Sequence, residues 1–385
     1  MSEIKVNSIK GVGASTAAIT VNNTTGGCSA NLTNNLTNRN IIINGAMQIA
    51  QRGSSVTGLS ASNKVQAVDR FFCRIAGNAG TWTVSRSTDA PEGFANSLKW
   101  DCTTARTSPH ATDDFAYLQQ RIEGFNVQHL KKGTANALKT TLSFFVKSNK
   151  TGNFAVRLND QDNSRVIGAT YSISSANTWE RKTITFDGDT SASGVLDNDN
   201  AQSMNVLWWM VVGSGRTSGS APSSWTSVAT SNEAVGQTVN MADSTDNEFL
   251  ITGVQLEVGE VATDFEMLSI DQQTSACQRY YYKDPSGGKD FGPWVTYTSN
   301  GDTRGRQQHV KEMRAAPTIT FSSTTWRIVG TSSSSTPVNV NMTGVTAANA
   351  SPKSWSINTN SLSGHGDVVA WGSNSSIIIA AESEL

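Results

Sequence analysis

Alternation of apolar and polar side chains dominates the central part of the chain. Phe154, Val156 and Leu158 are separated by polar or small residues, and residues 98–102 and 142–146 repeat that spacing. A period of two places the apolar side chains on one face of a strand. Residues 206–212 are continuously apolar, which is typical of a central strand buried on both faces. The pattern predicts many short strands between residues 41 and 267.

Turn-forming residues separate these predicted strands. Residues 187–189 and 197–200 are rich in Asp, Gly and Asn, which favour tight turns. Many short antiparallel strands with this spacing indicate two packed sheets. We therefore predict an all-β protein whose main body, residues 41–267, is a jelly-roll-like β-sandwich.

One helix is predicted directly after the sandwich. Ser269 and Gln272 have the spacing of a capping box, and the stretch that follows runs to Tyr282 before Pro285. We interpret residues 268–284 as a linker helix between two β regions.

The two ends of the chain have few apolar residues. Residues 1–40 begin with a short alternating stretch and continue into a Thr-, Asn- and Gly-rich segment that cannot offset its own ordering entropy. Residues 285–385 contain short strand candidates but few large apolar side chains for a monomeric core. We expect a partner to order the first segment. We expect the last region to be a β-rich knob whose core is shared within a trimer.

Composition and charge exclude several classes of protein. The chain has 385 residues, with 30 Lys and Arg against 31 Asp and Glu, so it lacks a basic surface for nucleic acid. No apolar run approaches the roughly 18–20 residues that span a bilayer, and the first residues do not resemble a secretory signal. The 4 cysteines are too scattered for a disulfide framework or a Cys-x-x-Cys metal site. Only 16% of residues are charged, so Ser, Thr and Asn supply the polar surface.

Recognisable catalytic and metal-binding motifs are missing from the sequence. It contains no G-x-S-x-G, H-E-x-x-H or P-loop motif. Asp113 and Asp114 are paired carboxylates, but glycoside hydrolysis needs a defined separation across a cleft that adjacent residues do not establish. Asp and Asn between residues 187 and 199 offer oxygen ligands for Ca²⁺, but turn chemistry explains them better. We predict no catalytic residues, no metal site and no cofactor.

The 10 tryptophans are the strongest sign of a ligand in the sequence. Aromatic rings stack on the apolar faces of sugars, while amides and carboxylates contact the hydroxyl groups. Four tryptophans lie within strand patterns and are assigned to the core: Trp82, Trp100, Trp208 and Trp209. Four others are the candidates for glycan binding at a surface or interface: Trp225, Trp294, Trp355 and Trp371.

Several strings, taken in order, resemble a known family. They include NIIINGAMQIAQRG at residues 40–53, ITGVQLEVG at residues 251–259 and CQRYY at residues 277–281. The series resembles the carbohydrate-binding-module-like region of bacteriophage tail fibre and receptor-binding proteins. SEIKVNSI at residues 2–9 looks like the start of cyanophage-type fibre proteins.

The resemblance implies a non-enzymatic, homotrimeric protein of the virion tail that is assembled in the host cytoplasm. Its N-terminal segment would dock on a nozzle or adaptor protein of the tail, with Ile4, Val6 and Ile9 as the anchoring residues. Its C-terminal region would face a bacterial surface glycan, where three copies add avidity. Two alternatives remain: a purely structural virion component, such as a nozzle, an adaptor or a capsid-decorating fibre, and a polysaccharide depolymerase.

Overall fold

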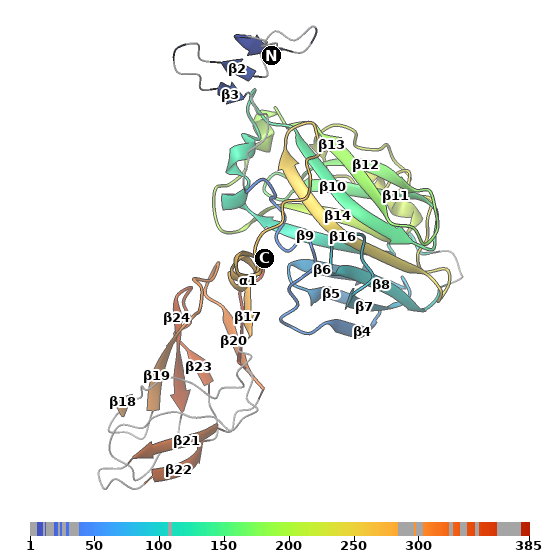
Figure 1. The fold of residues 1–385 in the computed structure, drawn as a ribbon. Coiled ribbons are helices and arrows are strands. Elements are labelled where there is room, and N and C mark those ends of the chain that lie inside the picture. The colour runs from blue at the N-terminus through green and yellow to red at the C-terminus, as the bar shows by residue number, and fades with distance from the viewer. Residues whose placement is uncertain are drawn as a thin grey trace.

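Two packed antiparallel sheets form the body of the protein in the computed structural model (Figure 1). The structure describes residues 6–10, 12, 19–21, 24, 28–30, 38–106, 110–283, 296–297, 303–322, 326–331, 337–342, 346–359 and 379–385. The six-stranded sheet has the order β13 (Glu180–Phe186), β10 (Thr140–Ser148), β16 (Glu248–Val258), β8 (Ser97–Thr104), β7 (Thr81–Ser87) and β4 (Ser55–Leu59). The seven-stranded sheet has the order β15 (Thr226–Ser227), β12 (Arg165–Ile173), β11 (Gly152–Asp160), β14 (Gln202–Val212), β9 (Phe115–Glu123), β6 (Phe71–Ala76) and β5 (Ser62–Val68).

Aromatic and aliphatic side chains fill the space between the two sheets. Phe144 of one sheet meets Trp208 of the other edge-to-face, with ring centroids 5.9 Å apart. Trp82 and Trp100 make a second edge-to-face pair at 5.6 Å. The four tryptophans assigned to the core from the sequence are each 0% exposed. The prediction of an all-β sandwich is confirmed, and β14 is central in its sheet as the apolar run at residues 206–212 indicated.

Short 3-10 helices lie in the loops of the sandwich: η1 (Gly124–Asn126), η2 (Gln128–Leu130), η3 (Ala192–Gly194), η4 (Ser214–Arg216) and η5 (Thr230–Asn232). No helix within the described ranges is both long enough and apolar enough to cross a bilayer.

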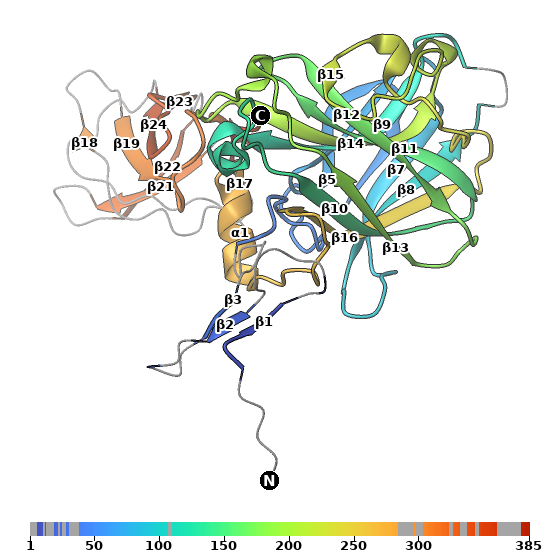
Figure 2. The same cartoon turned by 90° about the horizontal axis from the view of Figure 1, so that it is seen from above.

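Helix α1 (Ile270–Gln278) follows the sandwich, but it is shorter than the predicted 268–284, because Tyr281–Lys283 form strand β17 and pair with β25 (Ile379–Glu382). Its capping box is formed: Ser269 Oγ accepts a hydrogen bond from the Gln272 amide, and Gln272 Oε1 accepts one from the Ser269 amide. Tyr280, just beyond the helix, is fully buried and donates its hydroxyl to Glu123 Oε2 at 2.8 Å. The helix is therefore fixed to β9 of the sandwich (Figure 2).

The remaining strands form four small sheets. Their orders are β1 (Ser8–Ile9)–β2 (Ile19–Val21)–β3 (Cys28–Ala30), β17 (Tyr281–Lys283)–β25 (Ile379–Glu382)–β20 (Thr318–Phe321), β18 (Thr296–Tyr297)–β19 (Thr303–Gln308)–β24 (Ser354–Thr359)–β23 (Thr346–Ala348), and β21 (Trp326–Thr331)–β22 (Pro337–Met342). In both views β1–β3 lie outside the sandwich. The distal strands β18–β24 confirm the β character expected after residue 285, and the trimeric knob stays a prediction.

The last residues of the chain return to the sandwich. Strand β25 pairs with β17 on one side and with β20 on the other. Beyond it, Glu384 forms an ion pair with Arg70, which is 1% exposed, and the Leu385 carbonyl accepts a hydrogen bond from Arg121. The C mark accordingly lies beside α1 in Figure 1. The chain thus enters and leaves the distal region at one junction.

Candidate functional site: a groove on the seven-stranded sheet

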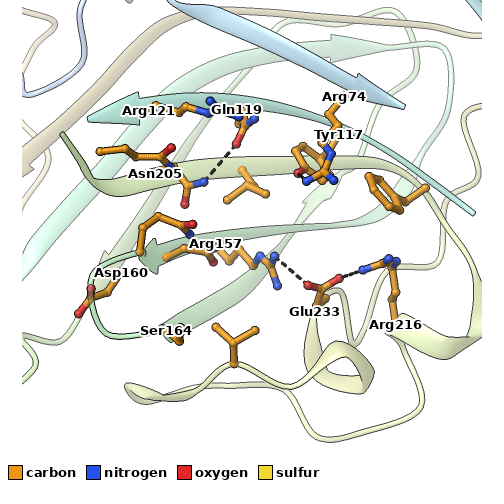
Figure 3. Close-up of a pocket in the computed structure, with 16 residues that line it drawn as sticks. Arg74, Tyr117, Gln119, Arg121, Arg157, Asp160, Ser164, Asn205, Arg216 and Glu233 are labelled. Atoms are coloured by element: carbon orange, nitrogen blue, oxygen red, sulfur yellow. Dashed lines mark hydrogen bonds and ion pairs between the residues drawn. The ribbon is translucent and has the colours of Figure 1, made fainter. Parts of the chain in front are cut away.

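The outer face of the seven-stranded sheet is hollowed above β9, β11 and β14. The cavity has a volume of about 340 Å³ and is lined from β6, β9, β11 and β14 and from loop residues 161–164 and 216–233 (Figure 3). This volume lies at the lower end of the range of about 300–1,000 Å³ that is typical of ligand pockets.

The strand period explains which side chains reach the groove. On β9, Tyr117, Gln119 and Arg121 line the groove, whereas Leu118 belongs to the core between the sheets. The pairing register then aligns the neighbouring strands, because Arg121 lies opposite Asn205 of β14 and Asn205 lies opposite Asn159 of β11. Gln119 lies two residues from Arg121 on the same face of β9 and reaches Asn205 diagonally, so a row of amide side chains crosses three adjacent strands.

These amides are buried and only partly paired. Asn205 Nδ2 donates to Gln119 Oε1 at 3.1 Å. Gln119 Nε2, Asn205 Oδ1 and Asn159 Oδ1 have no hydrogen-bond partner among the protein atoms of the described residues, although the three side chains are only 2%, 4% and 5% exposed. A buried polar group left unpaired costs about 1–3 kcal/mol. The wall of the groove thus contains one unused donor and two unused acceptors.

A cluster of aromatic and cationic side chains forms the other end of the groove. Trp209, Tyr117 and Phe115 pack together, with the Tyr117 and Trp209 ring centroids 5.1 Å apart. The guanidinium of Arg157 lies 5.0 Å from the Trp209 ring centroid, and that of Arg216 lies 4.3 Å from the Phe115 centroid. This stacking restrains both guanidinium groups before any ligand arrives.

Glu233 joins the two arginines of this cluster. Its carboxylate accepts a hydrogen bond from Arg157 Nη2 at 3.1 Å and also pairs with Arg216, as the dashed lines in Figure 3 mark. Burial lowers the pKa of Arg157, and the charge of Glu233 opposes that effect. The single carboxylate of Glu233 is therefore shared by two guanidinium groups, each of which lies near an aromatic ring.

The tryptophans proposed from the sequence do not converge on this groove. Trp225 is partly buried, donates from Nε1 to the Asp187 carbonyl at 2.6 Å and has Lys132 Nζ 4.3 Å from its ring centroid. The expectation of a surface ring is wrong for Trp355, which is 3% exposed because its place on β24 packs it against Phe321. Trp294 and Trp371 lie outside the described residues.

Two of the three expected anchoring residues, Val6 and Ile9, lie beside or in the small N-terminal sheet. Val6 is 45% exposed and Ile9 is 55% exposed, and Ile4 lies outside the described residues. Exposed aliphatic side chains of this kind are available for contact with another protein.

The aspartates of the Asp-rich loops are bonded to lysine and arginine side chains or to backbone amides of the protein. Both oxygens of Asp189 accept hydrogen bonds from Arg165, and Oδ2 also accepts one from Lys132. Asp114 accepts backbone hydrogen bonds from Asn78 and Ala111. Among the described residues, no group of three or more His, Cys, Asp or Glu side chains is arranged to hold a metal ion. These aspartates therefore stabilise loops.

Sequence reasoning missed the groove residues Gln119, Arg157, Asn159 and Asn205. A signal for one of them was present, because Arg157 alternates with the core-facing Val156 and Leu158 and must point to the other face. What the pattern cannot show is that loop residues 216–233 rise over that face and turn an outer surface into a groove.

The comparisons with known proteins find solved structures with low sequence identity and low TM-scores. No family model matches the sequence, and no curated protein matches it. Solved structures with similarity include a putative sugar binding protein from Bacteroides thetaiotaomicron, with 15% identity over 57% of this chain and 100% of that chain and a TM-score of 0.33. A family 11 carbohydrate-binding module from Clostridium thermocellum shows 11% identity over 55% of this chain and 99% of that chain, with a TM-score of 0.26.

A phage protein is also among the similar structures. The enzymatically active domain of tailspike protein 4 from bacteriophage CBA120 shows 14% identity over 57% of this chain, with a TM-score of 0.31. The match covers 21% of that domain, so the present chain spans about a fifth of its length. Because all these TM-scores are low, the assignment of a sandwich rests on the strand order itself.

Proposed function

We propose that this protein is a non-enzymatic, glycan-binding component of a phage tail fibre that holds a host surface polysaccharide in the groove. The observation that carries the proposal is the row of buried, incompletely paired amides on β9, β11 and β14. A sugar hydroxyl both donates and accepts a hydrogen bond, so successive hydroxyls can satisfy Gln119 Nε2 and the oxygens of Asn205 and Asn159.

The two carboxylates of the groove support binding rather than hydrolysis. Glu233 is paired with Arg157 and Arg216, and Asp160 is paired with Lys132. Glycoside hydrolysis requires a carboxylic acid that keeps its proton and delivers it to the leaving group. Both carboxylates are occupied by cationic side chains of the protein itself, so neither is positioned to deliver a proton to a leaving group.

Three features of the chain support the tail-fibre role. The sequence resembles phage fibre proteins, Val6 and Ile9 expose apolar side chains beside and in a sheet that lies outside the sandwich, and the distal strands form a separate β region. In the proposed arrangement the N-terminal sheet docks on a nozzle or adaptor protein, and three copies present their grooves and tips to one host surface.

The test is a paired substitution that removes the amides but keeps their volume. Replacing both partners of a buried hydrogen bond by apolar groups of similar shape is nearly neutral or stabilising for folding. We expect Gln119→Met with Asn205→Leu to retain the thermal unfolding midpoint and to weaken binding of host surface polysaccharide by about tenfold or more, which corresponds to about 1.4 kcal/mol. Affinity electrophoresis of the full chain measures the binding.

Asn136→Ala is the matched control, because Asn136 is an exposed amide outside the groove and its loss leaves binding unchanged. Unchanged binding by the double variant contradicts the assignment of the groove. A wild-type protein that binds no host polysaccharide favours a purely structural virion component. Sustained release of reducing sugar by the wild-type protein establishes a depolymerase instead.

A further inference from the structure

The charges that line the groove are unbalanced. Four arginines contribute to its wall, Arg74, Arg121, Arg157 and Arg216, against two carboxylates, Asp160 and Glu233. The formal net charge of the whole chain is -1, so this excess of positive charge is local. An excess of cations in a concave, partly buried site attracts anions.

Most of the negative charge near the groove is already engaged by other groups. Asp160 is bonded to Lys132 Nζ and to the side chain of Asn163. Glu384, which lies near Arg121, forms its ion pairs with Arg70 and Arg52. Glu233 is thus the one carboxylate of the groove lining that pairs with guanidinium groups of that lining, and two of them share it.

The arginines keep unused donors in buried positions. Arg157 Nε and Nη1, Arg216 Nε and Arg121 Nε have no hydrogen-bond partner within the described part of the protein, and Arg157 is only 5% exposed. A buried charged group that lacks part of its hydrogen bonds is costly, and an oxyanion would supply those bonds. Burial also lowers the pKa of Arg121, as it does that of Arg157, so an added negative charge would relieve both groups.

The amide row and the arginines lie side by side in the groove. Figure 3 shows Gln119 and Asn205 on one side of the groove and Arg157, Glu233 and Arg216 on the other. From this juxtaposition we infer that the groove selects an acidic glycan, whose sugar units carry a carboxylate or a sulfate group. The oxyanion binds beside Glu233, at the donors of Arg157 and Arg216 that Glu233 does not occupy, and the hydroxyls bind the amides. This inference rests on the proposed glycan-binding function of the same groove.

The experiment compares each acidic polysaccharide with its own neutral form. The full chain is titrated with a panel of uronate and sulfated polysaccharides, each beside its carboxyl-reduced or desulfated product, at low and at high salt. We expect at least tenfold tighter binding to acidic members, and a preference that shrinks as salt screens the charges. A larger loss of affinity on carboxyl reduction than on desulfation identifies the bound oxyanion as a carboxylate. The reverse result identifies it as a sulfate.

Two arginine variants connect the selectivity to the groove. Arg157→Met and Arg216→Met should each lower the affinity for acidic polysaccharide about tenfold more than the affinity for the neutral forms. The thermal unfolding midpoint of each variant reports whether the protein stays folded. Arg181→Met is the matched control, because Arg181 is an exposed arginine on the other sheet. We expect Arg157→Lys to recover only part of the loss, since lysine restores the charge without the guanidinium geometry.

The possible results test selectivity for acidic glycans separately from glycan binding itself. Equal affinity for the acidic and neutral forms, or selectivity that survives both arginine substitutions, overturns the inference and leaves glycan binding in the groove intact. Failure of the protein to bind any member of the panel counts against the proposed function as well.

Discussion

Lys132 places an ammonium group inside the sandwich. Its side chain is 3% exposed, and Nζ bonds to Asp160, to Asp189 at 2.9 Å and to the Gly194 carbonyl at 3.2 Å. Trp225 covers this charge with its ring, which accounts for a tryptophan in a loop. A buried ion pair persists only when its charges are well compensated. The loop that contains Asp189 is therefore held by electrostatics.

Asp189 gives the protein a defined sensitivity to acid. Burial by itself raises the pKa of Asp189, but hydrogen bonds from Arg165 and Lys132 outweigh it and hold the pKa below the usual 3.8. A folded-state pKa below the unfolded value stabilises the protein above about pH 4, and that contribution is lost as the pH falls through the folded value. We expect Asp189→Asn to lower the unfolding free energy at neutral pH by about 3 kcal/mol.

Urea unfolding at neutral pH and below pH 4 measures this effect. The wild-type protein should lose more stability on acidification than Asp189→Asn does, because the variant has already lost the contribution. Asp113→Asn, a change at an exposed aspartate, should follow the wild-type curve. If Asp189→Asn and the wild type lose equal amounts on acidification, the ion pair does not contribute as described.

At the scale of elements, helix α1 and strand β25 are locked to the sandwich by one cluster of charges. Arg70 lies 3.5 Å from the Tyr280 ring centroid, pairs with Glu384 and donates to the Arg121 carbonyl at 2.7 Å. Glu123 accepts hydrogen bonds from both Arg279 and Tyr280. The cluster ties residues after the helix and the last residues of the chain to β6 and β9.

Two glutamates of the last segment, separated by one residue, provide a matched test of this lock. Glu384 is 3% exposed in its ion pair with Arg70, whereas Glu382 is 53% exposed in its contact with Arg52. We expect Glu384→Gln to cost about 3 kcal/mol, because it leaves Arg70 buried without its partner, and Glu382→Gln to cost less than about 1 kcal/mol.

Hydrogen exchange should show where the stability is lost. In Glu384→Gln, amides of residues 279–283 and 379–385 should exchange faster, while amides of β14 should remain protected. Uniform loss of protection across the sandwich would instead mean that the cluster supports the whole fold rather than the junction.

The same elements show how far the sequence alone leads. Strand β11 and helix α1 are predictable because a period of two and a capping box are local patterns. The buried position of Trp355 depends on its contact with Phe321, which is 34 positions away along the chain, and no local pattern reports it. The groove depends on strand pairing in register and on a loop that covers the sheet, and both are long-range features.

At the scale of the whole molecule, the prediction concerns assembly. The N-terminal sheet exposes Val6 and Ile9, and the helix region exposes Met267 at 53% and Ile270 at 56%. Exposed apolar side chains on small elements outside the main body are typical of surfaces that contact another chain. We expect light scattering of the purified protein to give three times the chain mass of 41.0 kDa. A stable species at the mass of one chain would contradict the trimer.

The pairing of β17 with β25 has a consequence for how the protein can vary. Lys283, the last residue before the distal region, lies opposite Ala380, near the point where the chain comes back. Within that interval, strand β20 and Arg314 also bond to the last segment of the chain, whereas β18, β19, β23 and β24 form one separate sheet and β21 and β22 another. Insertions, deletions or replacement of strands in these two separate sheets leave the β17–β25 stem and the groove in place. A lineage under pressure to recognise a new surface can therefore change its tip without refolding its body.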